Sequence, residues 1–261
     1  MDGGDWRRWR HAVKLDPARP IAPEVVGRLA ATGTDALILG GSDGIRRDAV
    51  VQLMAAARAS GLPVAVEVSS TEAVVPGADW YLIPMVLNTG DPRWLVGAHR
   101  EALERLDRIA PGIPVPWDRV VTEAYVVCNP DATVARLTAA RPPAGPDEVA
   151  AWATVAERLL RADIVYIEYS GRYGEPAWVR AAAGVLRRAR LFYGGGLASA
   201  EQAAAMAAWA HTVVVGNALY RPDGLECVRA TVAGVRRTGS GEGGEPLAAG
   251  GRLPERRLRP V

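Results

Sequence analysis

The residues with the clearest chemical potential end one apolar segment, Lys14-Leu15-Asp16-Pro17. Side chains two positions apart on a strand share a face, so Lys14 and Asp16 point together. Lys14 is the only lysine among 31 basic residues, which suggests a position that a planar guanidinium cannot fill. A salt bridge closing the strand would explain the pair. So would a diphosphate site in which Asp16 holds Mg²⁺ and Lys14 neutralises phosphate oxygens.

A second polar set belongs to the segment YIEYSG, residues 166–171. Tyr166, Glu168 and Ser170 alternate with their neighbours and therefore share one face of a strand. A carboxylate among apolar strands is costly to bury unless it meets a donor or a cation. Glu168 is therefore expected either to pair with an arginine or to take part in chemistry.

Glycine-rich turns follow three of the apolar segments. The first is Gly40-Gly41-Ser42-Asp43-Gly44, and the last two are Gly194-Gly195-Gly196 and Gly216-Asn217. Backbone N–H groups in such turns can approach an anion closely. In (β/α)8 barrels the loops after the seventh and eighth strands frequently form a phosphate site. Two such turns in that order predict a phosphorylated substrate.

These residues need a framework, and the chain alternates β-rich runs with amphipathic stretches. The predicted strands are His11–Asp16, Ala36–Gly40, Val64–Ser69, Asp79–Pro84, Glu123–Cys128, Ile164–Ser170, Leu191–Gly194 and Thr212–Gly216. The predicted helices are Pro23–Ala31, Arg46–Ser60, Arg93–Ile109, Asp131–Ala139, Asp147–Leu160, Pro176–Arg188, Ser199–Trp209 and Asp223–Arg236. Nearly continuous apolar strands between helices indicate a parallel sheet. Eight repeats favour an α/β fold of the TIM (β/α)8-barrel type over an open doubly wound sheet.

One connection is too short for this pattern. Only STEAVVPGA separates the third predicted strand from the fourth, whereas a parallel crossover usually takes a dozen or more residues. We expect no regular helix there, which leaves an apolar groove open to a ligand or a partner subunit. A shortened connection without functional consequence is the alternative.

Composition narrows the function classes. The net charge is only +2, so we expect no nucleic-acid partner. No apolar run is long enough to span a membrane, and the first residues lack the apolar core of a signal peptide. Two cysteines are too few for a disulfide framework, so we expect a reducing cytoplasm. We predict one barrel domain over residues 1–237 and a disordered tail over 238–261, where Gly, Pro and Arg occur without periodicity.

Several motifs together resemble those of the geranylgeranylglyceryl/heptaprenylglyceryl phosphate synthase family. They are KLDP (14–17), GTDALILGGSDG (33–44), EVSS (67–70), YLIPMVLN (81–88), YIEYSG (166–171), FYGGG (192–196) and VVGNALY (214–220). The resemblance runs from about Trp9 to Arg236 and is closer to the bacterial heptaprenyl enzymes than to the geranylgeranyl enzymes. It implies a barrel that lacks one helix beside the third strand, with a prenyl chain lying along the barrel.

The resemblance also implies roles for individual residues. Lys14 would contact glycerol phosphate, and Asp16 and Ser42 would bind Mg²⁺. The phosphate of sn-glycerol 1-phosphate would be held by Gly196, Gly216 and Asn217. The rest of that substrate would be bound by Tyr166, Ile167, Glu168, Tyr169, Ser170 and Gly171, with Tyr166 and Glu168 toward its hydroxyls.

We expect the 3-hydroxyl of glycerol phosphate to attack C1 of a prenyl diphosphate while Glu168 takes or orients its proton, with Lys14 and Tyr166 as further catalytic residues. In relatives that use a C20 chain, a bulky aromatic closes the groove on the helix that here reads WLVGAHREAL. The matching position is Ala102, whose small side chain favours heptaprenyl diphosphate. The resemblance further implies a homodimer, and the lipid product suggests transient contact with a membrane surface.

Two other functions remain open at this stage. A phosphosugar isomerase or synthase of amino-acid or thiamine biosynthesis would use the same phosphate turns, but it would need neither a long apolar groove nor a metal at Asp16. A non-catalytic lipid- or phosphate-binding barrel would bind these ligands without turnover.

Overall fold

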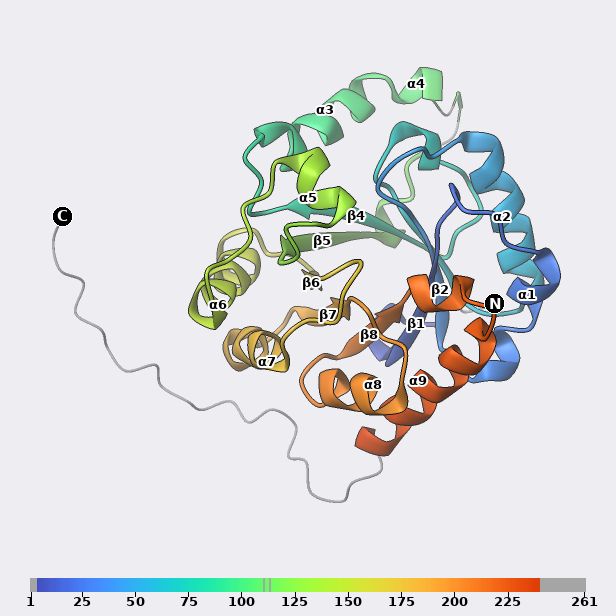
Figure 1. Cartoon of the computed structure of the whole chain (residues 1–261). Helices are drawn as coiled ribbons and strands as arrows, with labels where there is room; N and C mark the ends of the chain where they lie inside the picture. The colour runs from blue at the N-terminus through green and yellow to red at the C-terminus, as the bar shows by residue number, and fades with distance from the viewer. Residues whose placement is uncertain (1–3, 110, 113, 240–261) are drawn as a thin grey trace, which may run out of the picture.

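The computed structural model describes residues 4–109, 111–112 and 114–239. Eight parallel strands close into a barrel in sequence order, β1 to β8, with β8 paired to β1 (Figure 1). Their bounds are β1 His11–Leu15, β2 Ala36–Leu39, β3 Val64–Glu67, β4 Trp80–Val86, β5 Val120–Val127, β6 Ile164–Glu168, β7 Arg190–Gly194 and β8 Thr212–Val215. The predicted (β/α)8 barrel is therefore confirmed.

Alternation along the strands produces two apolar layers. On β1, Val13 and Leu15 belong to the layer between sheet and helices, while Ala12 points into the barrel beside Ala36 of β2. Both layers are almost fully buried from solvent, since every residue of β2, β3 and β8 is buried. Such continuous apolar strands are stable only with helices outside and packed side chains inside.

The helices surround the barrel (Figure 1). Their bounds are α1 Pro23–Gly27, α2 Arg47–Ala59, α3 Gly97–Glu104, α4 Leu106–Ile109, α5 Thr133–Thr138, α6 Pro146–Thr154, α7 Pro176–Val185, α8 Ala200–Ala207 and α9 Gly224–Gly239. Local signals explain several starts. Proline occupies the first turn of α1, α6 and α7, and the Ser199 hydroxyl caps α8 by accepting from the Gln202 N–H.

The connection between β3 and β4 contains a single short 3-10 turn, Thr71–Ala73. The helix expected of a regular crossover is absent there, as predicted. The next α-helix, α3, follows β4 and lies outside β4 and β5 (Figure 1). The outer face of this part of the sheet is therefore left for a groove.

Several sequence predictions need correction. The stretch Pro23–Ala31 is not one helix, because α1 ends at Gly27 and a separate 3-10 turn covers Ala30–Thr32. The stretch Arg93–Ile109 is not one helix: a 3-10 turn, Pro92–Trp94, precedes α3, and Arg105 separates α3 from α4. The tail does not begin at residue 238, because α9 continues to Gly239 and the Thr238 hydroxyl donates to the Val235 carbonyl at 2.7 Å. Residues 240–261, for which we predicted disorder, lie outside the described residues.

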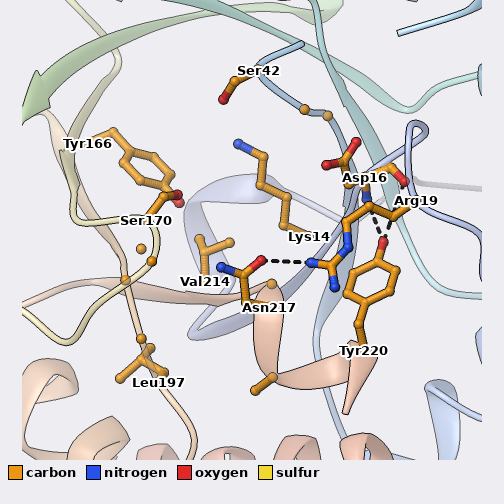
Figure 2. Close-up of a pocket in the computed structure, with 18 residues that line it drawn as sticks. Lys14, Asp16, Arg19, Ser42, Tyr166, Ser170, Leu197, Val214, Asn217 and Tyr220 are labelled. Carbon is orange, nitrogen blue, oxygen red and sulfur yellow. Dashed lines mark hydrogen bonds between the residues drawn. The ribbon is translucent and has the colours of Figure 1, made fainter. Parts of the chain in front are cut away.

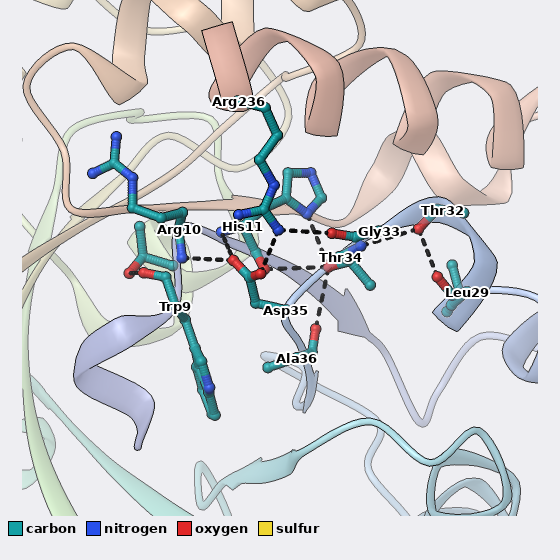
Figure 3. A network of polar contacts seen from close by, with 11 residues as sticks. Trp9, Arg10, His11, Leu29, Thr32, Gly33, Thr34, Asp35, Ala36 and Arg236 are labelled. Atoms are coloured by element: carbon teal, nitrogen blue, oxygen red, sulfur yellow. Dashed lines mark hydrogen bonds and ion pairs between the residues drawn. The ribbon is translucent and has the colours of Figure 1, made fainter. Parts of the chain in front are cut away.

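A polar network closes the barrel at the N-terminal ends of the strands (Figure 3). The Asp35 carboxylate accepts from the backbone N–H groups of Arg10 and His11 at 2.8 and 2.9 Å, and it pairs with Arg236 of α9 at 2.6 Å. The buried His11 ring lies 2.9 Å from the Thr34 hydroxyl and 3.0 Å from the Thr231 hydroxyl. The network joins β1, the start of β2 and the last helix.

Candidate active site

A polar pocket of about 110 Å³ opens at the C-terminal ends of the strands (Figure 2). It is lined by the loops after β1, β2, β6, β7 and β8, which is where (β/α)8 enzymes place their working residues. The predicted site residues that line it are Lys14, Asp16, Ser42, Tyr166, Ser170, Gly171, Gly196, Gly216 and Asn217. Residues far apart in the sequence are thus brought to one opening.

Lys14 does not pair with Asp16. Its ammonium lies 2.8 Å from both carboxylate oxygens of Glu67, on β3, and 3.4 Å from the Tyr125 hydroxyl. Burial alone would lower the pKa of Lys14, but the carboxylates of Glu67 and Glu168 raise it overall, so the ammonium stays charged. The salt bridge that the sequence suggested within β1 is replaced by one across the barrel.

Asp16 and Ser42 present oxygen atoms to the pocket. The Asp16 carboxylate accepts from the Ala18 N–H at 2.9 Å and rests against Gly41, where a Cβ atom would lie 2.4 Å from the carboxylate oxygen. Glycine is therefore required at residue 41 for close approach. No cluster of three His, Cys, Asp or Glu side chains suited to a metal occurs in the described ranges.

Strand β6 separates its side chains between two layers. Tyr166 and Glu168 are buried inside the barrel, and the Glu168 carboxylate accepts from the Ser170 N–H at 2.5 Å. Burial raises the pKa of Glu168, while the Lys14 ammonium opposes the shift. Glu168 has no arginine partner among the described residues, which removes the structural alternative considered for it.

Two predicted substrate-binding residues need correction at the side-chain level. Ile167 and Tyr169 belong to the apolar layer between sheet and helices, and Tyr169 packs against Trp178 of α7. The alternation of the strand that turns Tyr166 and Glu168 inward turns these two side chains outward. Neither residue lines the polar pocket or the groove.

The turn after β7 leaves no room for side chains. Gly196 has φ +57°, and a Cβ there would lie 2.2 Å from the Tyr173 nitrogen. A Cβ on Gly194 would lie 2.0 Å from the Tyr166 hydroxyl oxygen. Facing this turn, Gly216 and Asn217 follow β8. Both loops bring backbone to the same part of the pocket, an arrangement suited to an anion.

The sequence interpretation missed three buried polar residues inside the barrel, Glu67, Glu123 and Tyr125. Tyr125 stacks on Tyr166 with ring centroids 4.5 Å apart, and its hydroxyl donates to Glu67. Glu123 is fully buried, and neither of its carboxylate oxygens has a hydrogen-bond partner within the described chain. The signal that singled out Glu168, a carboxylate within an apolar strand, was also available for Glu67 and Glu123.

An apolar groove of about 780 Å³ adjoins the polar pocket. It runs over the outer face of β4 and β5, where Tyr81, Ile83 and Val120 line it, and under α3, where Ala102 lines it. The groove and the polar pocket share lining residues, namely Lys14, Gly41, Ser42 and Ser170. The two cavities therefore meet at the mouth of the barrel.

Comparison with known proteins agrees with this geometry. The family model described as "PcrB family" matches residues 4–235. The chain belongs to the PcrB family. The match covers all eight strands, including the glycine-rich turns after β7 and β8 and the strands that line the groove.

Curated relatives cover the PcrB barrel almost end to end. Heptaprenylglyceryl phosphate synthase of Brevibacillus brevis is 47% identical over 234 residues, which are 90% of this chain and 98% of the relative. Geranylgeranylglyceryl phosphate synthase of Methanoculleus marisnigri is 45% identical over 234 residues, 89% of this chain and 99% of the relative. Sequence identity alone therefore does not distinguish a heptaprenyl from a geranylgeranyl substrate.

Solved structures support the fold. A (S)-3-O-geranylgeranylglyceryl phosphate synthase from Thermoplasma acidophilum, crystallised with its substrate sn-glycerol-1-phosphate, superposes with a TM-score of 0.76 at 24% identity, covering 88% of this chain and 94% of that chain. A thiamine phosphate pyrophosphorylase from Pyrococcus furiosus gives a TM-score of 0.55 at 14% identity, covering 90% of this chain and 97% of that one. At these identities the likeness is one of fold.

Proposed function

We propose that this PcrB-family protein is a prenyltransferase that joins the 3-hydroxyl of sn-glycerol 1-phosphate to C1 of a long-chain prenyl diphosphate and releases diphosphate. The observation that carries the proposal is the meeting of a polar, anion-suited pocket with an apolar groove at Lys14, Gly41, Ser42 and Ser170. One substrate is small and charged and the other is long and apolar. Their reacting atoms have to meet where the two cavities join.

The small substrate fits the polar pocket in one orientation. Its phosphate lies against the backbone of Gly196 and Gly216 and the amide of Asn217, because these groups line one side of the pocket. Its glycerol hydroxyls then extend toward Tyr166 and Glu168 of β6. Glu168 lines the adjoining groove rather than the polar pocket, and one of its carboxylate oxygens accepts from the Ser170 N–H at 2.5 Å, so it would meet a hydroxyl where the two cavities join.

The donor atoms present suit Mg²⁺. The Asp16 carboxylate and the Ser42 hydroxyl are hard oxygen ligands lining one pocket, and Mg²⁺ is commonly held by one or two carboxylates together with substrate phosphates and water. When bound, the ion would neutralise negative charge on the departing diphosphate. Asp16 and Ser42 are the residues that would hold it.

In the reaction a C–O bond forms between glycerol O3 and prenyl C1, and the bond between C1 and the diphosphate oxygen breaks. The hydroxyl proton passes to the Glu168 carboxylate, whose raised pKa makes it a stronger base than an ordinary glutamate. The Lys14 ammonium, which pairs with Glu67 at 2.8 Å, keeps a positive charge between the phosphate of sn-glycerol 1-phosphate and the departing diphosphate. Tyr166 orients the glycerol.

The small side chain of Ala102 in the groove favours a heptaprenyl chain. Ala102 lies on α3 over the groove and offers only a methyl group. Each buried methylene contributes about 0.8 kcal/mol, so a blocked isoprene unit would cost on the order of 3 kcal/mol. A small residue here leaves that apolar surface available.

Three further properties belong to the proposal: a homodimer, a cytoplasmic location, and transient contact with a membrane surface when the lipid product leaves. Both cysteines are free, which suits a reducing compartment. No helix in the described parts of the chain is long and apolar enough to cross a membrane. Leu103 and Trp117 border the groove with 52% and 65% of their surface exposed, and they supply an apolar rim for such contact.

The decisive experiment incubates the full chain with radiolabelled sn-glycerol 1-phosphate, Mg²⁺ and prenyl diphosphates of several lengths. Formation of a radiolabelled lipid, strongest with the heptaprenyl donor, supports the proposal. A phosphosugar enzyme shares the fold with thiamine phosphate pyrophosphorylase and would form no lipid. A silent binding barrel would bind both ligands without product, and either result would overturn the proposed activity.

A further inference from the structure

Arg19, in the loop after β1, has no assigned part in the site described above, yet it lines the polar pocket. Its guanidinium carbon lies 3.7 Å from the centroid of the Tyr220 ring. One guanidinium nitrogen donates to the Asn217 side-chain oxygen at 2.8 Å. Arg19 forms no ion pair with a carboxylate within the described ranges, and its contacts are with the Asn217 amide and the Tyr220 ring.

Tyr220 fixes this arginine from the opposite loop. It ends the short 3-10 turn Asn217–Tyr220 after β8, and its hydroxyl accepts from the Asp16 N–H at 2.8 Å. The ring therefore stands between the loops after β1 and β8 and offers its face to Arg19 (Figure 2). Stacking and one hydrogen bond hold the guanidinium in a single position.

That position decides the orientation of the Asn217 amide. A guanidinium has only donors, so the amide oxygen of Asn217 has to face Arg19. The amide nitrogen then faces the other way, toward the interior of the pocket where Lys14 and Val214 lie (Figure 2). A flipped amide would present an acceptor oxygen to the substrate phosphate and repel it.

We propose that Arg19 is a positioning residue of the glycerol phosphate site: it locks the Asn217 amide so that its N–H donors face the phosphate, and Tyr220 holds Arg19 in place. The inference rests on the proposed function, since it assumes that the anion in this pocket is sn-glycerol 1-phosphate. The positive charge beside the amide also strengthens those N–H groups as donors.

The test measures the Kd of sn-glycerol 1-phosphate for the full chain by calorimetry, together with the KM of each substrate. Arg19→Met is expected to raise the Kd about 10- to 100-fold, the range for a lost charge-assisted hydrogen bond. The KM of the prenyl diphosphate should change less than about threefold. Arg19→Lys retains a donor for the Asn217 oxygen and should stay within about fivefold of the wild-type Kd.

Arg221→Met is the matched control, because it removes the same charge next to Tyr220. Arg221 pairs with Asp223 at 3.2 Å and does not line the pocket. The Kd of sn-glycerol 1-phosphate for Arg221→Met should therefore equal that of the wild type. Equal losses in Arg19→Met and Arg221→Met would overturn the inference in favour of a general charge effect. An equal rise in both substrate KM values would also overturn it.

A double-mutant cycle tests whether Arg19 acts through Asn217. In an Asn217→Ala background, Arg19→Met should weaken binding less than about threefold further. If Arg19→Met raises the Kd in that background as much as it does in the wild type, Arg19 contacts the phosphate directly, and the positioning role is overturned. Wild-type protein that fails to bind sn-glycerol 1-phosphate would instead overturn the proposed function, whereas wild-type binding with an unchanged Kd in Arg19→Met rejects only the inference.

Discussion

At the scale of single residues, the carboxylates inside the barrel have different tasks although they surround one ammonium. Glu67 accepts two hydrogen bonds from Lys14, Glu168 accepts one from the Ser170 N–H, and Glu123 accepts none among the described residues. A carboxylate with no donor is best buried as the neutral acid. Glu67 therefore balances Lys14, and Glu168 is the group available to a substrate.

Glu168→Gln should remove turnover while leaving the fold and glycerol phosphate binding intact. The glutamine oxygen can still accept from the Ser170 N–H, but the amide cannot take the proton of the attacking hydroxyl. We expect kcat to fall by about 100-fold or more, with the Kd of sn-glycerol 1-phosphate changed only a few-fold. Single-turnover kinetics with calorimetry measures both, and full activity would remove Glu168 from the chemistry.

The same residue predicts a pH dependence. Burial raises the pKa of Glu168, so its carboxylate form appears only at a higher pH than in an ordinary glutamate. In the wild-type protein kcat/KM should still be increasing with pH above the range where exposed glutamates have ionised. The residual rate of Glu168→Gln should not show this increase with pH. An identical pH profile in both proteins would contradict the role of Glu168 as the base.

Glu123→Gln should stabilise the protein at neutral pH. Burial raises the pKa of Glu123 well above its usual value, with Glu67 adding to the rise. The unfolded chain therefore loses this proton at lower pH than the folded chain, and stability falls as pH rises toward the folded pKa. Glutamine mimics the neutral acid and removes that cost at pH 7.5. Urea unfolding should show the gain at pH 7.5 and little of it at pH 4, whereas destabilisation at both would contradict a neutral Glu123.

How far the site could be predicted is clearest at Lys14 and Ile167. The sequence identified Lys14 as exceptional because it is the only lysine, but its partner Glu67 is 53 residues away, and no local pattern measures that separation. The family resemblance implies a role for Ile167 only because the residue lies within the contiguous motif YIEYSG. Strict alternation on the strand would have excluded its side chain and retained Glu168.

At the scale of elements, the strands were predictable and the α3 region was not. Each strand is a dense apolar run, so most predicted ends differ by only one or two positions, as at Ser69; the largest error is at β5, which begins at Val120 instead of Glu123. The stretch from Arg93 to Ile109 has helical periodicity but lies over a groove instead of packing on the sheet. Helices draw most of their stability from tertiary packing, so this one breaks into short segments.

A bulky side chain on α3 should shorten the prenyl chain that the protein accepts. Ala102→Trp places a ring in the groove and displaces the distal isoprene units, each worth on the order of 3 kcal/mol when buried. We expect the KM for heptaprenyl diphosphate to rise at least about 100-fold and that for a C20 donor to change only a few-fold. Glu104→Trp, on the same helix but outside the groove, is the control. Unchanged chain-length preference in Ala102→Trp would place the prenyl chain elsewhere.

At the scale of the whole molecule, the barrel separates the site from what closes the fold. The polar pocket and groove occupy the C-terminal ends and outer flank of the strands, while the network around Asp35 and His11 ties β1, β2 and α9 at the opposite end. Eight repeated units were sufficient to predict closure. The contact of α9 with the first strand was not predictable, because His11 and Thr231 are 220 positions apart.

This closing network predicts acid sensitivity. Burial lowers the pKa of His11 to about 4, below its ordinary value of 6.5, so the ring is neutral in the folded protein. A depressed folded pKa means that the unfolded chain binds the proton first: the stabilisation is complete above pH 6.5 and is lost as pH falls toward 4. The loss amounts to on the order of 3 kcal/mol.

His11→Gln keeps a donor and an acceptor near Thr34 and Thr231 but does not titrate. Urea unfolding should show it less stable than wild type at pH 7.5 by about 1–3 kcal/mol, with the difference shrinking or reversing at pH 4.5. A difference that stays constant with pH would mean that the His11 ring is not held neutral and that the barrel owes its acid response to other groups.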